Sequence, residues 1–256
     1  MKSMCLFTLV VGCLLISASG VQAASILVHY SFDSNFNDDS GSNNHLSASS
    51  GTPNITTAAG EVKFGAGALN MDQSGTEEHL AFSSTVSLTY GNAWSMSWWG
   101  QRSSSALDSQ GMVAGTIAAN SNFIWTPDNS SVIQGLRLRN ATNNNAEYGN
   151  ISDDNAFHHW AVSYNGAGQV TAWRDGVNLG SRAWGGGITL THVGAGTTTQ
   201  NNSFWGQIDE LYIFSGTLTQ GEVNALRANN SLIIPAPAAL PAGLLMLGAI
   251  TMRRRR

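Results

Sequence analysis

Apolar and polar residues alternate in short runs along most of the chain, and clusters of Gly, Asn, Asp and Ser separate these runs. Such period-two runs are typical of β-strands that bury one face. The pattern predicts strands at 26–32, 67–71, 80–82, 94–99, 111–117, 123–125, 134–139, 160–164, 170–174 and 207–214. We therefore expect an all-β fold, an antiparallel β-sandwich of the jelly-roll type.

A hairpin and a short helix are the best-defined local motifs. Strands at 160–164 and 170–174 flank an Asn-Gly-Ala-Gly turn, whose residues tolerate the backbone angles of tight turns. The segment 33–44 is too polar for a strand and is expected to be a loop. Near the end of the domain, a threonine cap precedes a predicted helix at 221–227.

The first 23 residues have the order of a secretory signal peptide: Lys2, an apolar run from Leu6 to Ile16, and small residues up to Ala23. We expect cleavage after Ala23. An N-terminal membrane anchor is the alternative, but this apolar run is short for about 30 Å of hydrocarbon. Both cysteines lie within this segment, so the exported chain would contain no disulfide.

The last 25 residues, 232–256, form a second segment of distinct composition. The run 232–252 has 21 residues without a charge, and as a helix it would span about 31 Å. This run predicts a transmembrane helix at about 235–252. Arg253, Arg254, Arg255 and Arg256 follow it and should stay on the cytoplasmic side of the inner membrane. The domain at 24–231 would then lie outside that membrane.

The charge of the predicted domain argues against one class of partner. All 16 acidic residues lie between 24 and 231, against seven basic residues in the same range. Affinity for phosphates requires clustered Lys and Arg. We therefore expect no binding of nucleic acid.

Four stretches resemble the laminin G-like members of the concanavalin A-like lectin/glucanase superfamily. They read HYSFD at 29–33, KFGAGALNMD at 63–72, FHHWAVSY at 157–164 and GQIDELYIF at 206–214. The sequence departs from many relatives in the order His159-Trp160 and in the doubled tryptophan Trp98-Trp99. The resemblance implies one jelly-roll domain over 24–231, and the fold does not by itself define a function.

The C-terminal segment resembles the PEP-CTERM sorting signal, which consists of a proline motif, an apolar helix and a basic cluster. The motif here is Pro235-Ala236-Pro237, with alanine in place of the usual glutamate. The resemblance implies an exosortase-type processing enzyme as a partner. The alternative is a simple membrane anchor that is never cut.

The sequence contains no recognisable set of catalytic residues. Glucanases of this superfamily place carboxylates at alternate positions of one strand, and no Glu-x-Asp-x-Glu pattern occurs. The adjacent pairs Glu77-Glu78 and Asp153-Asp154 would point to opposite faces of a strand, so we expect solvated loop charges. His158-His159 begins a strand and is expected to be structural. We therefore expect that the protein is not an enzyme.

Calcium is the more plausible ligand of the acidic residues. The loop at 33–40 is rich in hard oxygen donors. Asp209 has the parity of Leu211 on its strand and should point inward, where an ionised carboxylate needs a cation or several donors. Laminin G-like relatives imply a structural calcium, for which Asp33, Asp39 and Asp209 are the candidates. Hydrogen-bonded turns without metal are the alternative.

Tryptophan rings suit the flat faces of pyranose sugars. Most of the eight tryptophans are expected in the core, and Trp125 and Trp184 are the candidates for ligand binding because Pro or Gly lies nearby. Together these features predict a non-enzymatic cell-surface or matrix protein that binds a glycan or an envelope protein, and the resemblance of the C-terminal segment implies a role in biofilm or exopolysaccharide assembly. A purely structural coat protein and a carbohydrate-active hydrolase are the alternatives.

Overall fold

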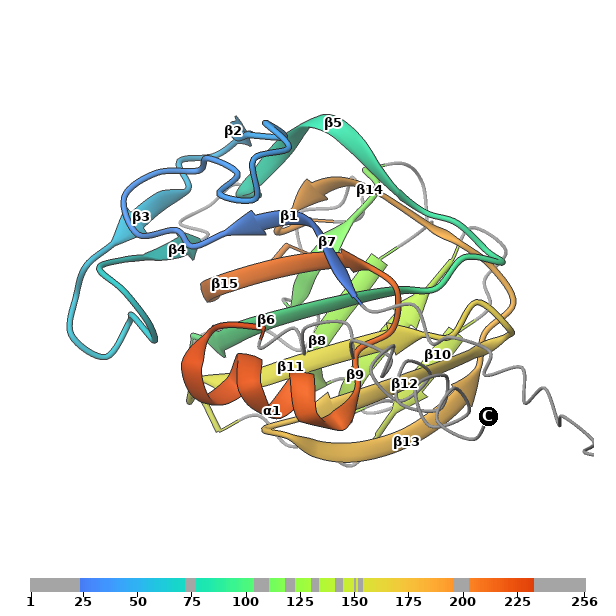
Figure 1. Ribbon diagram of the computed structural model, residues 1–256. Helices are drawn as coiled ribbons and strands as arrows, with labels where there is room; N and C mark the ends of the chain where they lie inside the picture. The colour runs from blue at the N-terminus through green and yellow to red at the C-terminus, as the bar shows by residue number, and fades with distance from the viewer. Residues whose placement is uncertain are drawn as a thin grey trace, which may run out of the picture.

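The computed structural model describes residues 24–71, 77–103, 111–117, 123–129, 134–140, 145–149, 151, 154–195 and 203–232. Within these residues, the strands form two antiparallel sheets, one of eight strands and one of seven, that pack against each other (Figure 1). This arrangement confirms the predicted all-β sandwich.

The eight-stranded sheet is built around its longest strands. In spatial order it contains β13 (Val177–Ala183), β12 (Gln169–Arg174), β11 (His158–Tyr164), β6 (Trp94–Arg102), β15 (Gly206–Ser215), β4 (Ala68–Met71) and β3 (Asn54–Thr56), with β1 (Ser25–Tyr30) also paired to β15.

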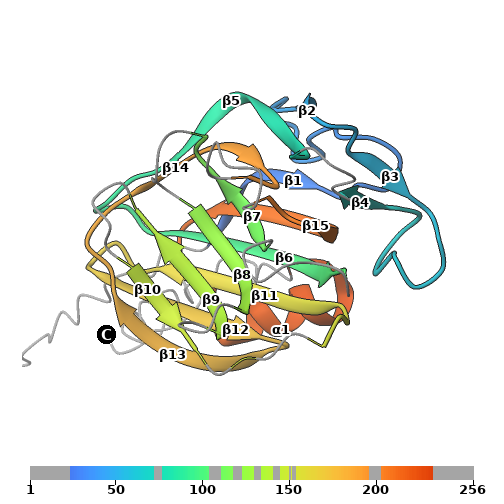
Figure 2. The same cartoon turned by 180° about the vertical axis from the view of Figure 1, so that it is seen from behind.

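The seven-stranded sheet forms the second layer. In spatial order it contains β10 (Asn145–Tyr148), β9 (Gln134–Arg139), β8 (Phe123–Asn129), β7 (Met112–Gly115), β14 (Ile188–Val193), β5 (His79–Leu88) and β2 (Leu46–Ser50). Figure 2 shows β8, β9 and β10 in front of β6, β11 and β12, so the sheets are separate layers.

The main hydrophobic core fills the space between the two sheets. Trp94, Trp98 and Trp160 each contribute a ring that is 2% exposed or less. Successive side chains of a strand point to opposite faces, so each strand gives the core only every second residue. The residues between them are available for the outer faces, where the loops and the helix lie.

The helix α1 (Gln220–Asn229) covers the outer face of the eight-stranded sheet (Figure 1). It begins with a capping box, in which the Thr219 side chain accepts a hydrogen bond from the Glu222 N–H and the Glu222 side chain accepts one from the Thr219 N–H. Its buried face joins a second apolar cluster, consisting of Ala24, Ala161, Trp173, Tyr212, Phe214, Leu218, Val223 and Leu226.

The strand β15 changes partner along one of its edges. Residues 206–208 pair with β4, and residues 211–215 pair with β1, while the other edge pairs with β6. A bulge separates the two parts: the register against β6 shifts between Asp209 and Tyr212, and Glu210 has a φ of 53°.

This bulge overturns the expected direction of Asp209. Ile208 and Leu211 both belong to the main core, so strict alternation does not hold between them. Asp209 pairs with Trp99, whose neighbour Trp98 is in the core, which places Asp209 on the outer face. Asp209 is fully buried there, beneath the loop that joins β3 and β4.

The two ends of the chain lie outside the described residues. The predicted signal peptide at 1–23, the transmembrane helix at about 235–252 and the arginines at 253–256 therefore stay predictions. In the described part of the chain, no helix has the length and apolar character needed to cross a bilayer.

Candidate functional site

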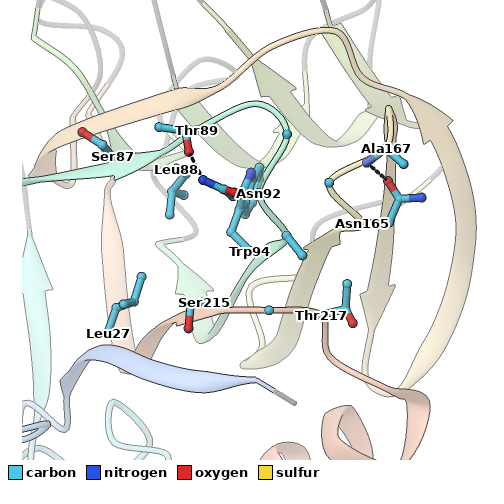
Figure 3. A pocket seen from close by; sticks show the side chains of 14 residues that line it. Leu27, Ser87, Leu88, Thr89, Asn92, Trp94, Asn165, Ala167, Ser215 and Thr217 are labelled. Atoms are coloured by element: carbon cyan, nitrogen blue, oxygen red, sulfur yellow. Dashed lines mark hydrogen bonds between the residues drawn. The ribbon is translucent and has the colours of Figure 1, made fainter. Parts of the chain in front are cut away.

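A cavity of about 740 Å³ opens at one end of the sandwich (Figure 3). Its wall comes from the end of β5, the turn 89–93 before β6, the turn 165–167 between β11 and β12, and residues 215–217 after β15. Leu27 of β1 completes it. The sheet order brings these segments together because β6 lies between β11 and β15.

The β5–β6 turn and the β11–β12 turn pack closely against each other. Gly166 has a φ of +75°, a conformation that favours glycine. A Cβ on this residue would lie 3.1 Å from the backbone nitrogen of Ala93 and 3.2 Å from the carbonyl oxygen of Gly91. Glycine therefore lets the β11–β12 turn approach the β5–β6 turn.

Two asparagine side chains stabilise these turns and still offer hydrogen-bonding groups. The Oδ1 of Asn165 accepts hydrogen bonds from the Ala167 and Gln169 N–H groups, at 2.8 and 3.1 Å. The Nδ2 of Asn92 donates to the Thr89 hydroxyl at 2.8 Å (Figure 3). In the part of the chain that the structure describes, the Nδ2 of Asn165 and the Oδ1 of Asn92 have no partner.

Three aromatic rings pack together near the opening, and among them Trp94 lines the cavity. The Tyr164 ring lies between those of Trp94 and Tyr90, with centroid distances of 5.8 and 6.0 Å. Trp94 is buried, and its indole nitrogen has no acceptor among the described residues. Tyr90 is 58% exposed. The ring that lines the cavity is therefore that of Trp94, and the exposed ring of Tyr90 belongs to the same turn as the lining residues Thr89 and Gly91.

The cavity has no charged wall. Among the described residues that line it, none is Asp, Glu, Lys, Arg or His, and the polar side chains are those of Asn, Ser and Thr. Such a surface binds a neutral, hydroxyl-rich ligand without the desolvation of a buried charge.

A separate group of charged residues surrounds His158. Its Nδ1 lies 2.6 Å from the Oδ2 of Asp175, and its Nε2 lies 2.7 Å from the Oδ1 of Asp154. The hydrogen bond to Asp175 is the largest cause of the raised pKa of His158. Both ring nitrogens therefore contact carboxylate oxygens.

His159 has a different environment. It is 1% exposed, and its Nε2 lies 2.8 Å from the Ser97 hydroxyl. Burial lowers its pKa to about 3, so the ring is neutral at physiological pH. These contacts support the structural interpretation of His158-His159.

The adjacent carboxylates at 77–78 differ from the expectation. Glu78 is 2% exposed, and its Oε1 accepts a hydrogen bond from the Thr52 N–H at 3.1 Å. The interpretation as solvated loop charge is therefore wrong for Glu78. Asp154 is 56% exposed at its side chain and contacts His158, whereas Asp153 lies outside the described residues.

The three predicted calcium ligands do not form one group of ligands. Asp33 accepts a hydrogen bond from the Ala66 N–H, and Asp39 accepts hydrogen bonds from the Ser31 backbone and hydroxyl. Within the described ranges, no group of three or more His, Cys, Asp or Glu side chains is arranged to hold a metal ion. The residues therefore do not fit a shared calcium site, and calcium binding by the chain stays a prediction.

Asp209 has a structural role that the sequence did not reveal. Its Oδ2 accepts hydrogen bonds from the Lys63 and Phe64 N–H groups, at 2.9 and 3.0 Å. Its Oδ1 is buried, with no hydrogen-bond partner among the described residues. Burial raises the pKa of Asp209 to about 7. The carboxyl group thus connects β15 to the loop after β3.

The two tryptophans predicted to bind ligand have different outcomes. Trp184 is 2% exposed and packs in the main core, so it presents no ring face to a ligand and this prediction is wrong. Trp125 lies in β8, where its backbone pairs with Met112, but its side chain lies outside the described part. Trp125 stays a prediction.

A family model described as "Concanavalin A-like lectin/glucanases superfamily" matches residues 74–224. The chain belongs to the concanavalin A-like lectin/glucanase superfamily. The match includes every segment of the cavity wall except Leu27. The search of the curated proteins found no match to this chain.

Solved structures with the same fold support this assignment. Domain 4 of AbnA, a GH43 extracellular arabinanase from Geobacillus stearothermophilus in complex with arabinotriose, has a TM-score of 0.61 and 20% identity. The match covers 80% of this chain and 98% of that domain. At 20% identity, the likeness shows the fold alone.

Two toxin domains share the fold. The binding domain of botulinum neurotoxin serotype D has a TM-score of 0.55 and 14% identity, with 79% of this chain and 51% of that chain covered. The binding domain of Paraclostridial Mosquitocidal Protein 1 has a TM-score of 0.54 and 14% identity, and the match covers 75% of this chain and 48% of that chain. This superfamily member thus spans about half the length of these toxin domains.

The cavity residues were missed in the sequence because each lies in an ordinary turn. Asn92 and Asn165 occupy glycine-containing turns, and Thr217 follows the last strand. Such residues are common wherever strands are joined. Only the order β11-β6-β15 within the sheet places the three turns side by side.

Proposed function

We propose that this protein is a non-enzymatic exported module that binds a neutral glycan in the cavity at the end of the sandwich. The observation that carries the proposal is the cavity itself, which combines uncharged polar side chains with the ring of Trp94. An aromatic face and nearby amides suit the apolar and hydroxyl surfaces of a sugar.

The fold is compatible with this function. Domain 4 of AbnA was solved in complex with arabinotriose, which is a neutral oligosaccharide. Fold alone does not define function, so the likeness supports the ligand class and does not identify the sugar. The absence of charge in the cavity wall makes acidic sugars poorer candidates than neutral ones.

Asn165 provides the sharpest test of this site. In Asn165→Asp, the Oδ1 still accepts the hydrogen bonds from Ala167 and Gln169, so the turn is retained. The substitution replaces the free Nδ2 amide, a hydrogen-bond donor, by a charged carboxylate oxygen. This oxygen cannot donate a hydrogen bond to a sugar hydroxyl. Asn178→Asp is the matched control, because the Oδ1 of Asn178 also accepts a hydrogen bond from a backbone N–H two residues later, that of Gly180, and Asn178 lies in β13 outside the cavity.

Calorimetric titration with neutral oligosaccharides, including arabino-oligosaccharides, and with uronic acid polymers would measure the effect. We expect binding of a neutral glycan that is at least about tenfold weaker in Asn165→Asp, equivalent to about 1.4 kcal/mol. Asn178→Asp should bind like the wild type. Equal loss in both variants, or preference for the acidic polymers, would contradict the site.

A protein partner is the second candidate for this surface. Ile26, Leu27 and Tyr90 are exposed large apolar residues, and Leu27 lines the cavity. Clustered exposed apolar residues are typical of protein interaction sites. Retention of an envelope protein that is lost in Tyr90→Ala, without any glycan binding, would favour this alternative.

We further propose that the chain is exported, sorted through its C-terminal segment, and used in biofilm or exopolysaccharide assembly. The support is the signal-like order of residues 1–23 and the PEP-CTERM-like order of 232–256. Intact-mass measurement and membrane fractionation, with and without the exosortase-type enzyme, test this. Loss of the segment after about residue 235 only when the enzyme is present would support sorting. An uncut chain in the membrane fraction would indicate a simple anchor.

A further inference from the structure

Two histidines lie together on the seven-stranded sheet, away from the cavity. His79 begins β5 and His192 lies in β14, which pairs with β5. Their neighbours Leu80 and Val193 belong to the main core, so both imidazoles lie on the outer face of the sheet. The cavity lies at the opposite end of β5, about 30 Å along an extended strand.

Each ring uses one nitrogen in a local hydrogen bond. The Nδ1 of His79 lies 2.9 Å from the Ser49 hydroxyl, and the Nδ1 of His192 lies 2.7 Å from the Thr191 hydroxyl. Among the described residues, neither Nε2 has a hydrogen-bond partner. In the tautomer in which Nδ1–H donates to the hydroxyl, the Nε2 lone pair is available, as at many metal-ligating histidines.

Both rings are suited to act as neutral ligands. Burial and the neighbouring His192 lower the pKa of His79 to about 4, and burial lowers the pKa of His192. Metal binding requires unprotonated imidazole. At neutral pH, these two rings therefore need not release a proton before they coordinate an ion.

The separation of the rings matches that of two imidazoles on one ion. Their centroids are 5.0 Å apart, and their planes meet at 84°. With a Zn–N distance of about 2.0–2.1 Å, a tetrahedral ion places the centroids of two bound imidazoles about 5 Å apart. The distance between the ring centroids is therefore compatible with two imidazoles bound to one ion.

We propose that His79 and His192 bind one borderline divalent transition-metal ion, of the class of Zn²⁺, Ni²⁺ or Cu²⁺. Imidazole suits these ions, whereas calcium prefers oxygen ligands. Within the described residues, no third His, Cys, Asp or Glu completes a set of protein ligands. The ion would retain exchangeable positions for water or an external ligand, and the site is independent of the glycan cavity.

Titration of the untagged, chelator-treated protein with ZnCl₂ and NiCl₂ tests the proposal. Calorimetry should give one ion per chain, and the ring ¹⁵N resonances that shift should be Nε2 of both histidines. His79→Gln and His192→Gln should each weaken binding by at least about tenfold. Ser49→Ala retains both ligands and should weaken binding by roughly tenfold, because it removes a hydrogen-bond partner of a ligand.

His45→Gln is the matched control. His45 is exposed, and its Nδ1 accepts a hydrogen bond from the Asp38 N–H, so its lone pair is already used. This variant should bind metal like the wild type. Unchanged affinity in both His79→Gln and His192→Gln, or no binding up to millimolar metal, would overturn the proposal. If a histidine variant does not fold, the metal affinity of Ser49→Ala still tests the proposal.

Discussion

Asp175 connects the turn after β12 to the start of β11, with its Oδ2 lying 2.6 Å from the Nδ1 of His158. Asp154 contacts the other nitrogen of the same ring. The pKa of His158 is raised above its usual value of 6.5, first by the hydrogen bond to Asp175. Protonated His158 therefore stabilises this corner of the eight-stranded sheet.

The stabilisation by His158 should depend on pH. A raised folded-state pKa gives stability that is fully present below pH 6.5 and is lost as the pH rises through the folded value. We expect His158→Gln to be less stable than the wild type at pH 5.5, with a smaller difference at pH 9. Urea midpoints across this range measure the difference. A difference that is constant with pH would contradict the ionic interaction.

The stability contributed by Asp209 should also decrease as the pH rises, because its carboxyl group is buried. Burial raises its pKa from 3.8 to about 7, so the folded state favours the protonated carboxyl group. The associated stability is present below pH 3.8 and is lost as the pH rises through about 7. Asp209→Asn removes this loss and retains an acceptor for Lys63 and Phe64. Relative to the wild type, the variant should be more stable at pH 8 than at pH 4.5.

Melting curves of wild type and Asp209→Asn with CaCl₂ and with EDTA add a test of the predicted calcium. A chelator effect that disappears in Asp209→Asn would support the carboxylate as a ligand. A wild-type melting temperature that is unchanged by both additives would remove calcium from the description of this chain.

The capping box of α1 should contribute measurably to stability. Thr219→Ala removes the side chain that accepts the Glu222 N–H, and loss of such a cap costs about 1 kcal/mol. For a domain of this size, the melting temperature should fall by about 2–4 °C. Thr219→Ser retains the hydroxyl and should lie close to the wild type. Equal effects of both changes would indicate lost packing of the threonine methyl group.

Tyr90 should contribute to ligand affinity with little effect on stability. Tyr90 is 58% exposed and belongs to the turn whose residues Thr89 and Gly91 line the cavity. Stacking of this kind contributes about 0.5–1.5 kcal/mol, so Tyr90→Ala should weaken glycan binding by about 2- to 10-fold. Val177→Ala is the control, since Val177 is 65% exposed and lies outside the cavity wall. An unchanged affinity in Tyr90→Ala would remove this residue from the glycan site.

The sequence predicted the inner strands better than the edges. The strand at 134–139 is present with the same bounds, as β9, and the helix at 221–227 lies within α1. The four edge strands β2, β3, β10 and β13 were not predicted. An edge strand has a neighbour on one side only and faces more water, so it needs less apolar alternation. β14 was also missed, although Ile188 and Leu190 alternate with threonines.

The candidate site was less predictable than the fold. Asn92 and Asn165 are 73 residues apart in the chain, and only the sheet order brings their turns together. A tryptophan beside glycines suggested a surface at Trp184, but the space between the sheets buried it. One inserted residue near Glu210 reversed the expected direction of Asp209. Long-range packing and local bulges are not visible in the alternation of single strands.

The pairing of β1 with β15 also sets an order of events during synthesis. Ser25 pairs with Ser215, so the first described strand obtains its partner only after nearly the whole domain has been made. Contacts between residues this far apart in sequence form slowly. The N-terminal strand thus stays without its partner while the rest of the chain emerges. If the chain is exported as proposed, this late pairing would delay completion of the eight-stranded sheet, and a translocation channel requires an unfolded chain.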